Sequence, residues 1–360
     1  MFCCSNCFND SEIRAIIDGG KRKGSCSFCG SSDVYVFDIE QDTTLAEMFG
    51  DLLDTYTPIS SLPEDFPRES TDLLKNILHS KWSIFNLNPD QIYRLLTTMC
   101  ADRYSEQPDL FDAPVGILQS YDPEYLDKNS ILKNSCWEDF VWEIKYRNRF
   151  HSNIINTDML FTFLRCAKKV YKAKNVFYRA RVCPDEKGYA KTEMGPPPDG
   201  KAGSGRVNPM GIQVLYLADS IQTTLYEIRA GIYDYVTVGR FVLNEDINVI
   251  NLAEIDKVSP FIGIQYGFDF TQYAINIDHL KMIGNEIAKP LRNDNHLDYL
   301  PTQYISDYIR SKGFDGIEYI STMRKKGVNL AVFDKSKLKC TKVSVYDITS
   351  ISYDYDEIAR

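Results

Sequence analysis

The sequence lacks several features that would assign it at once to a common class of protein. No apolar run is long enough to cross a bilayer, and the start, MFCCSNC, has no basic region followed by an apolar core. Histidine is scarce, with 4 in 360 residues, and no G-x-S-x-G turn accompanies these few, which argues against serine or cysteine hydrolase chemistry. The G-x-x-x-x-G-K-[ST] phosphate loop and the dinucleotide-binding glycine fingerprint are also missing. We therefore expect a cytoplasmic protein with no membrane partner.

Positive charge is also in short supply. The chain has 41 Lys and Arg against 50 Asp and Glu, which gives a net charge of −9. Such a chain is a poor candidate for broad nucleic-acid binding, because that binding is driven by cations facing phosphates. Apolar residues make up 44% and charged residues 25%, close to globular averages, so 360 residues suffice for two or three domains with buried cores.

Cysteine is present but concentrated at one end. Five of the 10 cysteines fall in the first thirty residues, and four of these form two C-x-x-C knuckles: Cys4, Cys7, Cys26 and Cys29. This spacing matches a four-thiolate zinc site, and Gly30 permits the backbone to fold beneath the metal. Four thiolates leave no position for a substrate, so the zinc is expected to be structural. Residues 1–40 are thus predicted to form a zinc ribbon, with Cys3 in place of Cys4 as an open alternative.

Between residues 41 and 172 the apolar residues recur at helical spacing. The pattern predicts a helical bundle, with Ser70 and Asn88 as helix N-caps and helices at 44–56, 70–85, 88–101, 135–151 and 157–171.

One stretch of this region carries possible chemistry, Arg147-Asn-Arg149-Phe-His151. A histidine beside arginines on a helix could activate a ribose hydroxyl and bind an RNA phosphate. The alternative is a basic solvated face that ends in a histidine.

A further stretch, 175–231, brings cationic, aromatic and acidic residues together. A strand over 175–182 is expected to place Tyr178 on one face and Arg179 on the other. After a loop rich in glycine and proline, a second strand is expected over 212–217, followed by a helix over 221–230 that Asp219 or Ser220 caps and Gly231 ends. Glu227 would lie opposite the apolar stripe of that helix. Such a set of groups suits a phosphorylated, ring-bearing small molecule.

The rest of the chain continues to alternate between strands and helices. Strands are expected at 235–243, 248–251, 316–320 and 329–333, and a helix over 302–312 that ends at Gly313. Residues 346–360 form an acidic, tyrosine-rich tail to which no role is assigned.

Together these motifs resemble a known family. Residues 175–334 are similar to the RES domain, and the matching stretches, in order, are Phe177-Tyr178-Arg179, 205–211 with 214–218, 224–227, Thr302-Gln303, 313–321 and 329–333. The cysteine knuckles and the helical region resemble the HEPN-type extension that precedes some RES domains.

This resemblance implies a compact α/β (α+β) fold similar to ADP-ribosyltransferases, with the catalytic domain over 173–345. It implies NAD⁺ as a substrate, consumed by phosphorolysis or hydrolysis or used for ADP-ribosyl transfer, and a toxin that an antitoxin or regulatory protein restrains. The naming residues of the family correspond to Arg179, Glu227 and Ser321. Further positions expected to line the NAD⁺ site are Tyr178, Arg206 and Tyr216.

The chemistry of these side chains suits such a reaction. Breaking the bond between nicotinamide and ribose puts positive charge on the ribose, which the carboxylate of Glu227 would stabilise. Arg179 and Arg206 would neutralise the pyrophosphate.

The remaining site residues would complete substrate binding. Tyr178 or Tyr216 would stack on nicotinamide or bond a ribose hydroxyl. Ser321 would hold nicotinamide or a second oxyanion.

Two other functions are compatible with the sequence. In the first, the helical region is a HEPN-type ribonuclease and the RES region regulates it. In the second, the RES region is a non-catalytic sensor of NAD⁺ or ADP-ribose. Nucleic acid is not an expected partner of the RES domain itself.

Overall fold

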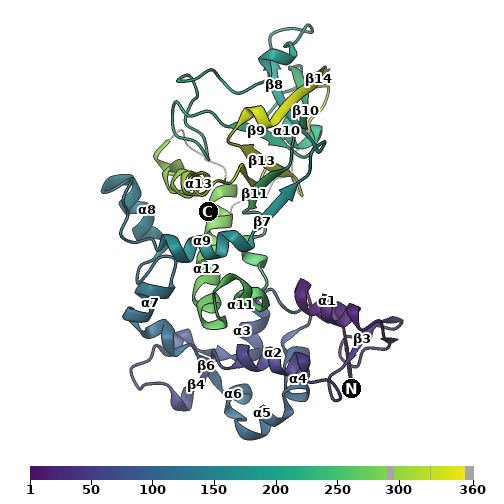
Figure 1. Ribbon diagram of the computed structural model, residues 1–360, viewed down its shortest axis with the longest axis vertical. Coiled ribbons are helices and arrows are strands. Elements are labelled where there is room, and N and C mark those ends of the chain that lie inside the picture. Colours follow the sequence, from purple (N-terminus) through teal and green to yellow (C-terminus); the bar gives the residue numbers. More distant parts are fainter. Residues whose placement is uncertain (290–295, 325, 353–360) are drawn as a thin grey trace. The chain divides into compact units, whose positions relative to one another are not determined.

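The structure is a computed structural model that describes residues 1–289, 296–324 and 326–352 (Figure 1). The chain divides into two units. Unit 1 consists of Met1–Phe140, Asn153–Cys166 and Ile255–Met282. Unit 2 consists of Val141–Ser152, Ala167–Glu254 and Ile283–Arg360.

Unit 1 begins with a small antiparallel sheet. Its strands β1 (Phe2–Cys4), β2 (Lys23–Gly24) and β3 (Val34–Asp38) lie in the order β1-β3-β2. Helix α1 (Ser11–Gly19) follows β1, and the side chain of Asp10 caps it by accepting from two backbone N–H groups. The sheet and this helix hold the two cysteine knuckles.

The remainder of unit 1 is mainly helical. Its helices are α2 (Thr44–Leu53), α3 (Leu74–Ser80), α4 (Pro89–Met99), α5 (Ala101–Glu106), α6 (Asp109–Asp112), α7 (Pro123–Asn129), α9 (Thr157–Cys166) and α11 (Gly263–Tyr266). Helices α8 (Trp137–Tyr146) and α12 (Phe270–Ala288) contribute residues to both units. The sequence pattern did not predict a second small sheet of β4 (Thr57–Pro58), β6 (Pro114–Gly116) and β5 (Asp72–Leu73).

The two predicted N-caps have different outcomes. Asn88 caps α4 in a capping box, accepting from the N–H of Gln91 at 2.9 Å while its own N–H donates to the Gln91 side chain at 3.1 Å. The prediction for Ser70 is wrong. Ser70 ends a short 3₁₀ turn, and Asp72 and Leu73 pair with β6, so α3 begins only at Leu74. Pairing with a strand 41 to 43 residues further along the chain overrides the local helical pattern.

Short 3₁₀ turns connect many of these elements. They are η1 (Ser5–Cys7), η2 (Ile59–Ser61), η3 (Arg68–Ser70), η4 (Leu118–Tyr121), η5 (Lys191–Glu193), η6 (Ile255–Lys257), η7 (Pro260–Ile262), η8 (His296–Tyr299) and η9 (Lys335–Lys337).

Unit 2 contains an eight-stranded sheet and is a mixed α/β structure, in line with the expected fold class. The strands lie in the order β14-β10-β8-β9-β13-β12-β11-β7, and among the pairs only β11 with β12 is parallel. Their bounds are β7 (Lys168–Tyr171), β8 (Val176–Cys183), β9 (Leu215–Ala218), β10 (Tyr235–Leu243), β11 (Ile247–Asn251), β12 (Gly316–Ile320), β13 (Val328–Val332) and β14 (Leu338–Asp347). Helices α10 (Ile221–Glu227) and α13 (Leu300–Ser311) accompany the sheet.

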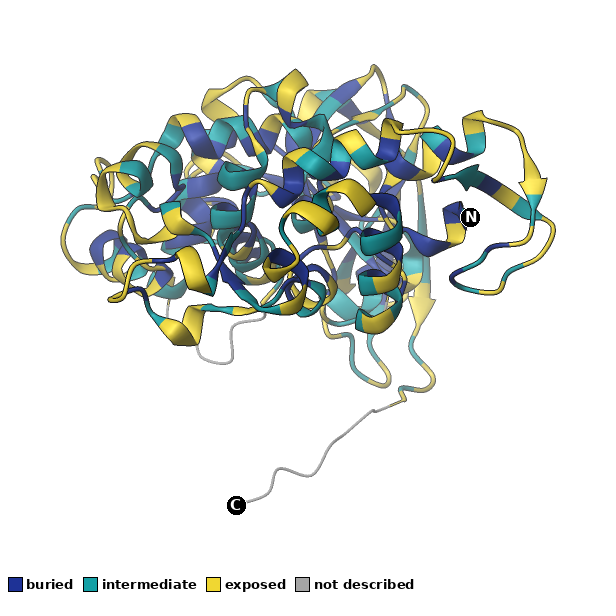
Figure 2. Ribbon diagram, turned by 90° about the horizontal axis from the view of Figure 1, so that it is seen from below, coloured by how far each residue is buried: buried dark blue, intermediate teal, exposed yellow. Residues whose placement is uncertain are grey.

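Each face of the sheet has its own core. Figure 2 colours the ribbon by burial, and strands β12 and β13 are buried over most of their length. Phe177, Leu217 and Phe241 belong to the larger cluster on one face. On the other face Ala180 and Val238 pack against the apolar side of α10. The expected alternation along β8 is therefore confirmed.

Most predicted elements of unit 2 are present, with small shifts in their ends. The strands at 235–243 and 316–320 are confirmed with the expected bounds, whereas the strand expected at 212 begins only at Leu215. Helix α12 and strands β7 and β14 were not predicted.

The helix predicted over 157–171 is wrong in its last five residues. Helix α9 ends at Cys166, and Lys168–Tyr171 form β7, which pairs with β11. The side chain of Lys169 there bonds both oxygens of the buried Glu318, at 2.8 and 3.0 Å. That partner lies 149 residues away, so no local pattern could reveal it.

The predicted acidic tail is only partly described. Residues 346 and 347 end β14, and the O of Ile348 accepts from the N–H of Tyr233 at 2.8 Å. Residues 353–360 lie outside the described residues.

Candidate functional site

A cleft in unit 2 lies where two neighbouring strands part. Strands β8 and β9 share a single bridge, Tyr178 with Ala218, and both strands contribute residues to the cleft beyond it. Its volume is about 330 Å³, within the range of about 300–1,000 Å³ that is typical of small-molecule sites. The lining residues are Arg179, Ala180, Arg206, Tyr216, Leu217, Ala218, Thr224, Glu227, Ile228, Tyr299, Tyr319 and Asn329.

Glu227 reaches the cleft from the last turn of α10. Ser220 caps this helix by accepting from the N–H of Thr223 at 3.1 Å, and Leu225 packs on the sheet. Glu227 therefore faces away from the apolar stripe, as predicted. Its Oε1 accepts two hydrogen bonds, from Ser321 Oγ at 2.5 Å and from Asn329 Nδ2 at 2.8 Å.

The end of α10 differs from the expectation that the helix runs to residue 230 and that Gly231 ends it. The helix ends at Glu227, and Arg229 takes the left-handed conformation with φ of 52°. The N–H of Arg229 donates to Tyr226 O and that of Ala230 to Leu225 O, the two bonds of a Schellman motif. An arginine occupies the position that glycine usually takes, which is why the sequence pattern placed the end of the helix three residues too late.

Arg179 carries a buried positive charge beside the cleft. Its guanidinium donates to the carbonyl O of Tyr216 at 3.1 Å, whereas its buried Nε has no hydrogen-bond partner among the described residues. Burial, and then the neighbouring charge of Arg181, lowers the pKa of Arg179 to about 10. The group is therefore still charged at neutral pH and has donor capacity left for an anion.

Arg206 is held by the end of a helix. One guanidinium nitrogen donates to the carbonyls of Ile287 and Ala288 at 2.9 and 2.8 Å, at the C-terminus of α12. A cation suits this position because the helix dipole is negative there. The guanidinium carbon also lies 5.4 Å from the ring centre of Tyr319, so Arg206 forms one wall of the cleft with an aromatic ring.

The glycine-rich loop is fastened to Tyr216. The Tyr216 hydroxyl donates to Asn208 Oδ1 at 2.6 Å and accepts from the N–H of Val207 at 3.2 Å. A Cβ on Gly205 would lie 2.6 Å from this hydroxyl, so only glycine fits. Burial raises the pKa of Tyr216, which keeps the phenol neutral and its donor in place. Gln303 of α13 holds the loop from the other side by donating to Gly205 O at 2.7 Å.

The structure brings four of the six predicted substrate-site residues to the cleft lining, namely Arg179, Arg206, Tyr216 and Glu227. Ser321 joins them indirectly. It lies directly after β12, is 3% exposed, and donates its only hydroxyl hydrogen to Glu227. Toward a ligand this hydroxyl could act only as an acceptor.

Tyr178 is not among the lining residues. It packs with Ala180 and the apolar side of α10, on the opposite face of β8 from Arg179. Its assignment to the NAD⁺ site stays a prediction that the cleft lining does not support.

Several lining residues were not singled out from the sequence. Asn329 is a polar residue in an otherwise apolar strand, and this contrast was the one available signal. Tyr299 and Tyr319 carry no such signal, because a tyrosine in a strand or turn is ordinary in a chain with 23 tyrosines.

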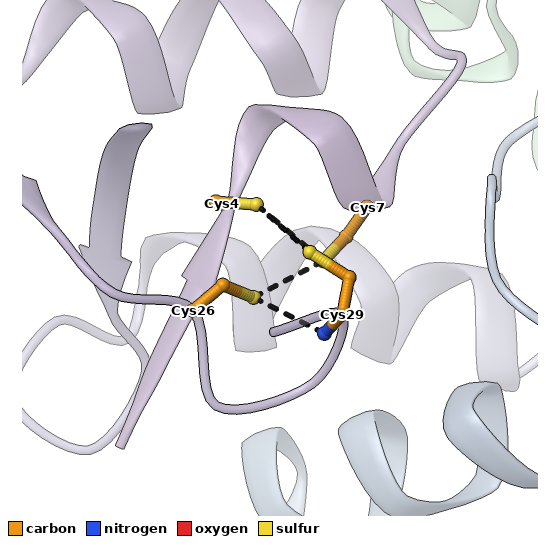
Figure 3. Close-up of side chains that lie close together, drawn as sticks. All are labelled: Cys4, Cys7, Cys26 and Cys29. Atoms are coloured by element: carbon orange, nitrogen blue, oxygen red, sulfur yellow. Dashed lines mark hydrogen bonds between the residues drawn. The ribbon is translucent and has the colours of Figure 1, made fainter. Parts of the chain in front are cut away.

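The four-cysteine cluster of unit 1 has the geometry of a metal site (Figure 3). The sulfur of Cys4 lies 3.8 Å from that of Cys7 and 3.4 Å from that of Cys29, and Cys7 and Cys26 are 3.4 Å apart. Tetrahedral zinc with bonds of about 2.3 Å requires sulfurs about 3.8 Å apart, close to these values. Cys3 points to the other face of β1, so Cys4 is the member of the cluster.

The prediction that Arg147–His151 lies on a helix is wrong. Helix α8 ends at Tyr146, and Asn148 bonds the backbone of His151 in a turn that follows. Arg147, Arg149 and His151 are exposed. Nothing in this arrangement supports a ribonuclease site.

None of the described helices combines the length and apolarity that a bilayer-crossing segment requires.

Comparison with known proteins finds one family model that matches the C-terminal half of the chain. A model described as the RES domain matches residues 176–356. No curated protein matches the chain. Among solved structures, the chain is similar to one in the crystal structure of the M. tuberculosis MbcT–MbcA toxin–antitoxin complex, with 15% sequence identity and a TM-score of 0.30. The alignment covers 52% of this chain and 91% of the other, and at this TM-score it carries no argument.

Proposed function

The chain belongs to the RES domain family, whose model matches half of it, and we propose on that basis that it consumes NAD⁺. In the proposed reaction the bond between ribose C1′ and the nicotinamide nitrogen breaks, and its electron pair leaves with nicotinamide. Water, phosphate or a protein side chain then forms the new bond at C1′. We also propose that the fold of this domain is similar to that of ADP-ribosyltransferases.

The observation that carries the proposal is a fixed carboxylate and a buried cation in one cleft. Glu227 is held at Oε1 by two donors, and Arg179 has a buried nitrogen without a partner. A fixed carboxylate would stabilise positive charge on the ribose without reorganisation during the reaction. The unpaired nitrogen of Arg179 would gain a partner from a phosphate of the substrate.

The tyrosines of the cleft supply the remaining contacts. Tyr299 and Tyr319 line it beside Arg206, so a flat ring would find an aromatic or guanidinium face to stack on there. Arg206 retains donors besides the nitrogen that binds α12, and these would reach a pyrophosphate oxygen.

The test is product analysis with a matched variant. Purified protein incubated with NAD⁺, with and without phosphate, should release nicotinamide, and the second product identifies the nucleophile. Glu227→Gln keeps the size of the side chain but removes its charge, so the rate should fall by about 100-fold or more. Glu186→Gln, at an exposed position outside the cleft lining, should behave as wild type. Unchanged NAD⁺ in the wild-type sample, or equal rates in wild type and Glu227→Gln, would refute the proposal.

We also propose that a partner protein restrains this activity, and this part of the proposal rests on the family resemblance alone. If the chain is a toxin, its expression without a partner should lower cellular NAD⁺ and arrest growth, while Glu227→Gln should do neither. Normal growth with active protein would argue against a toxin.

For unit 1 we propose that Cys4, Cys7, Cys26 and Cys29 bind one structural Zn²⁺. The support is the distance between their sulfurs and the N–H groups of Phe28 and Cys29, which donate to the Cys26 sulfur at 3.4 and 3.5 Å, as in a knuckle around a metal thiolate.

A further inference from the structure

Asn329 is a buried polar side chain in a strand of apolar residues. Its exposed fraction is 3%, and Leu330, Ala331 and Val332, which follow it in β13, are buried and apolar. Burial of a carboxamide is costly unless it is hydrogen-bonded. The bond that the structure shows is to Glu227, from Nδ2 to Oε1 at 2.8 Å.

The two donors to Glu227 converge on the same oxygen. Ser321 Oγ and Asn329 Nδ2 both reach Oε1, and no donor from the described residues reaches Oε2. These donors come from the end of β12 and from β13, which are adjacent strands, so the sheet sets their spacing. Two bonds at one oxygen fix the plane of the carboxylate and leave the other oxygen for a ligand in the cleft.

We infer that Asn329 is a positioning residue that aims Glu227 Oε2 at the ribose of the substrate. This inference rests on the proposed function, because it assumes that Glu227 acts on a ribose. An amide nitrogen suits the task since it can donate to a carboxylate at every pH and never becomes charged itself.

Two substitutions separate positioning from packing. Asn329→Leu keeps the approximate shape but removes the donor, and Asn329→Asp keeps the shape but places a second carboxyl against the first. In both variants kcat should fall by about 10–100-fold, as when a supporting hydrogen bond to a catalytic group is lost. The acid limb of the pH profile should move upward, because the carboxylate loses a donor or gains a like charge. KM for NAD⁺ should change less than kcat.

The controls address stability and position. Asn251→Asp, in the same sheet, should match wild type, because Asn251 Oδ1 accepts from the N–H of Ala253 and a carboxylate can do the same. Thermal melting separates the two roles, since a packing role would make the loss of activity follow a loss of stability. Variants that melt as wild type and keep its kcat and pH profile would overturn the inference.

A readout without turnover distinguishes this inference from the proposed function. The pKa of Glu227 can be measured by carbon NMR on glutamate-labelled protein, with Glu227→Gln identifying its signal. We expect a higher pKa in Asn329→Leu than in wild type. That result together with unchanged NAD⁺ in wild type would refute the proposed function and retain the positioning role. An unchanged pKa would refute the positioning role, whatever the protein does to NAD⁺.

Discussion

At the scale of single residues, the cleft is built from charges that the fold itself does not fully satisfy. Glu227 has one oxygen bound by protein donors, and Arg179 has one buried nitrogen with no partner. Buried polar groups are nearly always paired in native proteins, so an exception at a cleft points to a ligand. Glu227 and Arg179 both line the cleft, so their unused hydrogen-bonding atoms are available to a ligand there.

The first prediction concerns the stability that the protein loses by burying the charge of Arg179. Burial lowers its pKa to about 10, so the folded protein binds this proton less tightly than the unfolded chain does. The cost is constant below pH 10 and is relieved only as the pH rises above 10. Arg179→Met should therefore raise the free energy of unfolding at pH 7, by about 1–3 kcal/mol, while abolishing NAD⁺ consumption.

Denaturant melts and NAD⁺ assays on the same samples check this prediction. Arg240→Met is the matched control, because Arg240 is exposed, lies outside the cleft lining and donates to Thr341 Oγ1 at 3.2 Å. It should retain activity without gaining stability. A large loss of stability in Arg179→Met would mean that its charge is well compensated in the free protein.

At the scale of elements, the termination of α10 fixes where Glu227 stands. The Schellman bonds of Arg229 and Ala230 stop the helix directly after Glu227, which places this side chain at the exit of the helix beside β13. The left-handed conformation of Arg229 is the strained part of this arrangement, since a residue with a Cβ is disfavoured there.

The second prediction follows from that conformation. Arg229→Gly should stabilise the protein by about 0.5–1 kcal/mol, because glycine adopts a positive φ without strain. Gly231→Ala should change stability by less than about 0.5 kcal/mol, because Gly231 has no positive φ and an added Cβ meets only the Asp234 side chain, at 3.3 Å. Thermal melts of both variants provide the measurement. The reverse order of effects would place the end of the helix at Gly231.

At the scale of the whole molecule, the two units are stabilised in different ways. Unit 2 has an eight-stranded sheet with a core on each face. The N-terminal part of unit 1 has a three-stranded sheet of short strands, too small to bury much apolar area alone, and the cysteine cluster joins its ends. A metal would supply the missing stability there.

The third prediction is therefore that metal removal acts mainly on unit 1. The purified protein should contain about one zinc per chain, and a strong chelator should lower the melting temperature. Cys4→Ser should lose the metal, whereas Cys3→Ser should retain it, because Cys3 points away from the cluster. Elemental analysis of the two variants decides the matter, and equal zinc content in both would exclude the assignment of Cys4.

Much of the fold and part of the site followed from local patterns. The strand at 235–243, the cap at Asn88 and the outward face of Glu227 depend on residues within a few positions of one another, so the sequence shows them. The elements that were missed depend on distant partners. Strand β7 exists because it pairs with β11, and the 70–85 helix is shortened because Asp72–Leu73 pairs with β6.

The sequence by itself determined which chemical groups this protein has and the order in which its family motifs occur, because motifs and caps are local. Only the tertiary structure decided which groups meet. It placed Asn329 on Glu227 across 102 residues of chain. Such contacts arise when strands pair, and pairing depends on the whole sheet rather than on any segment of it.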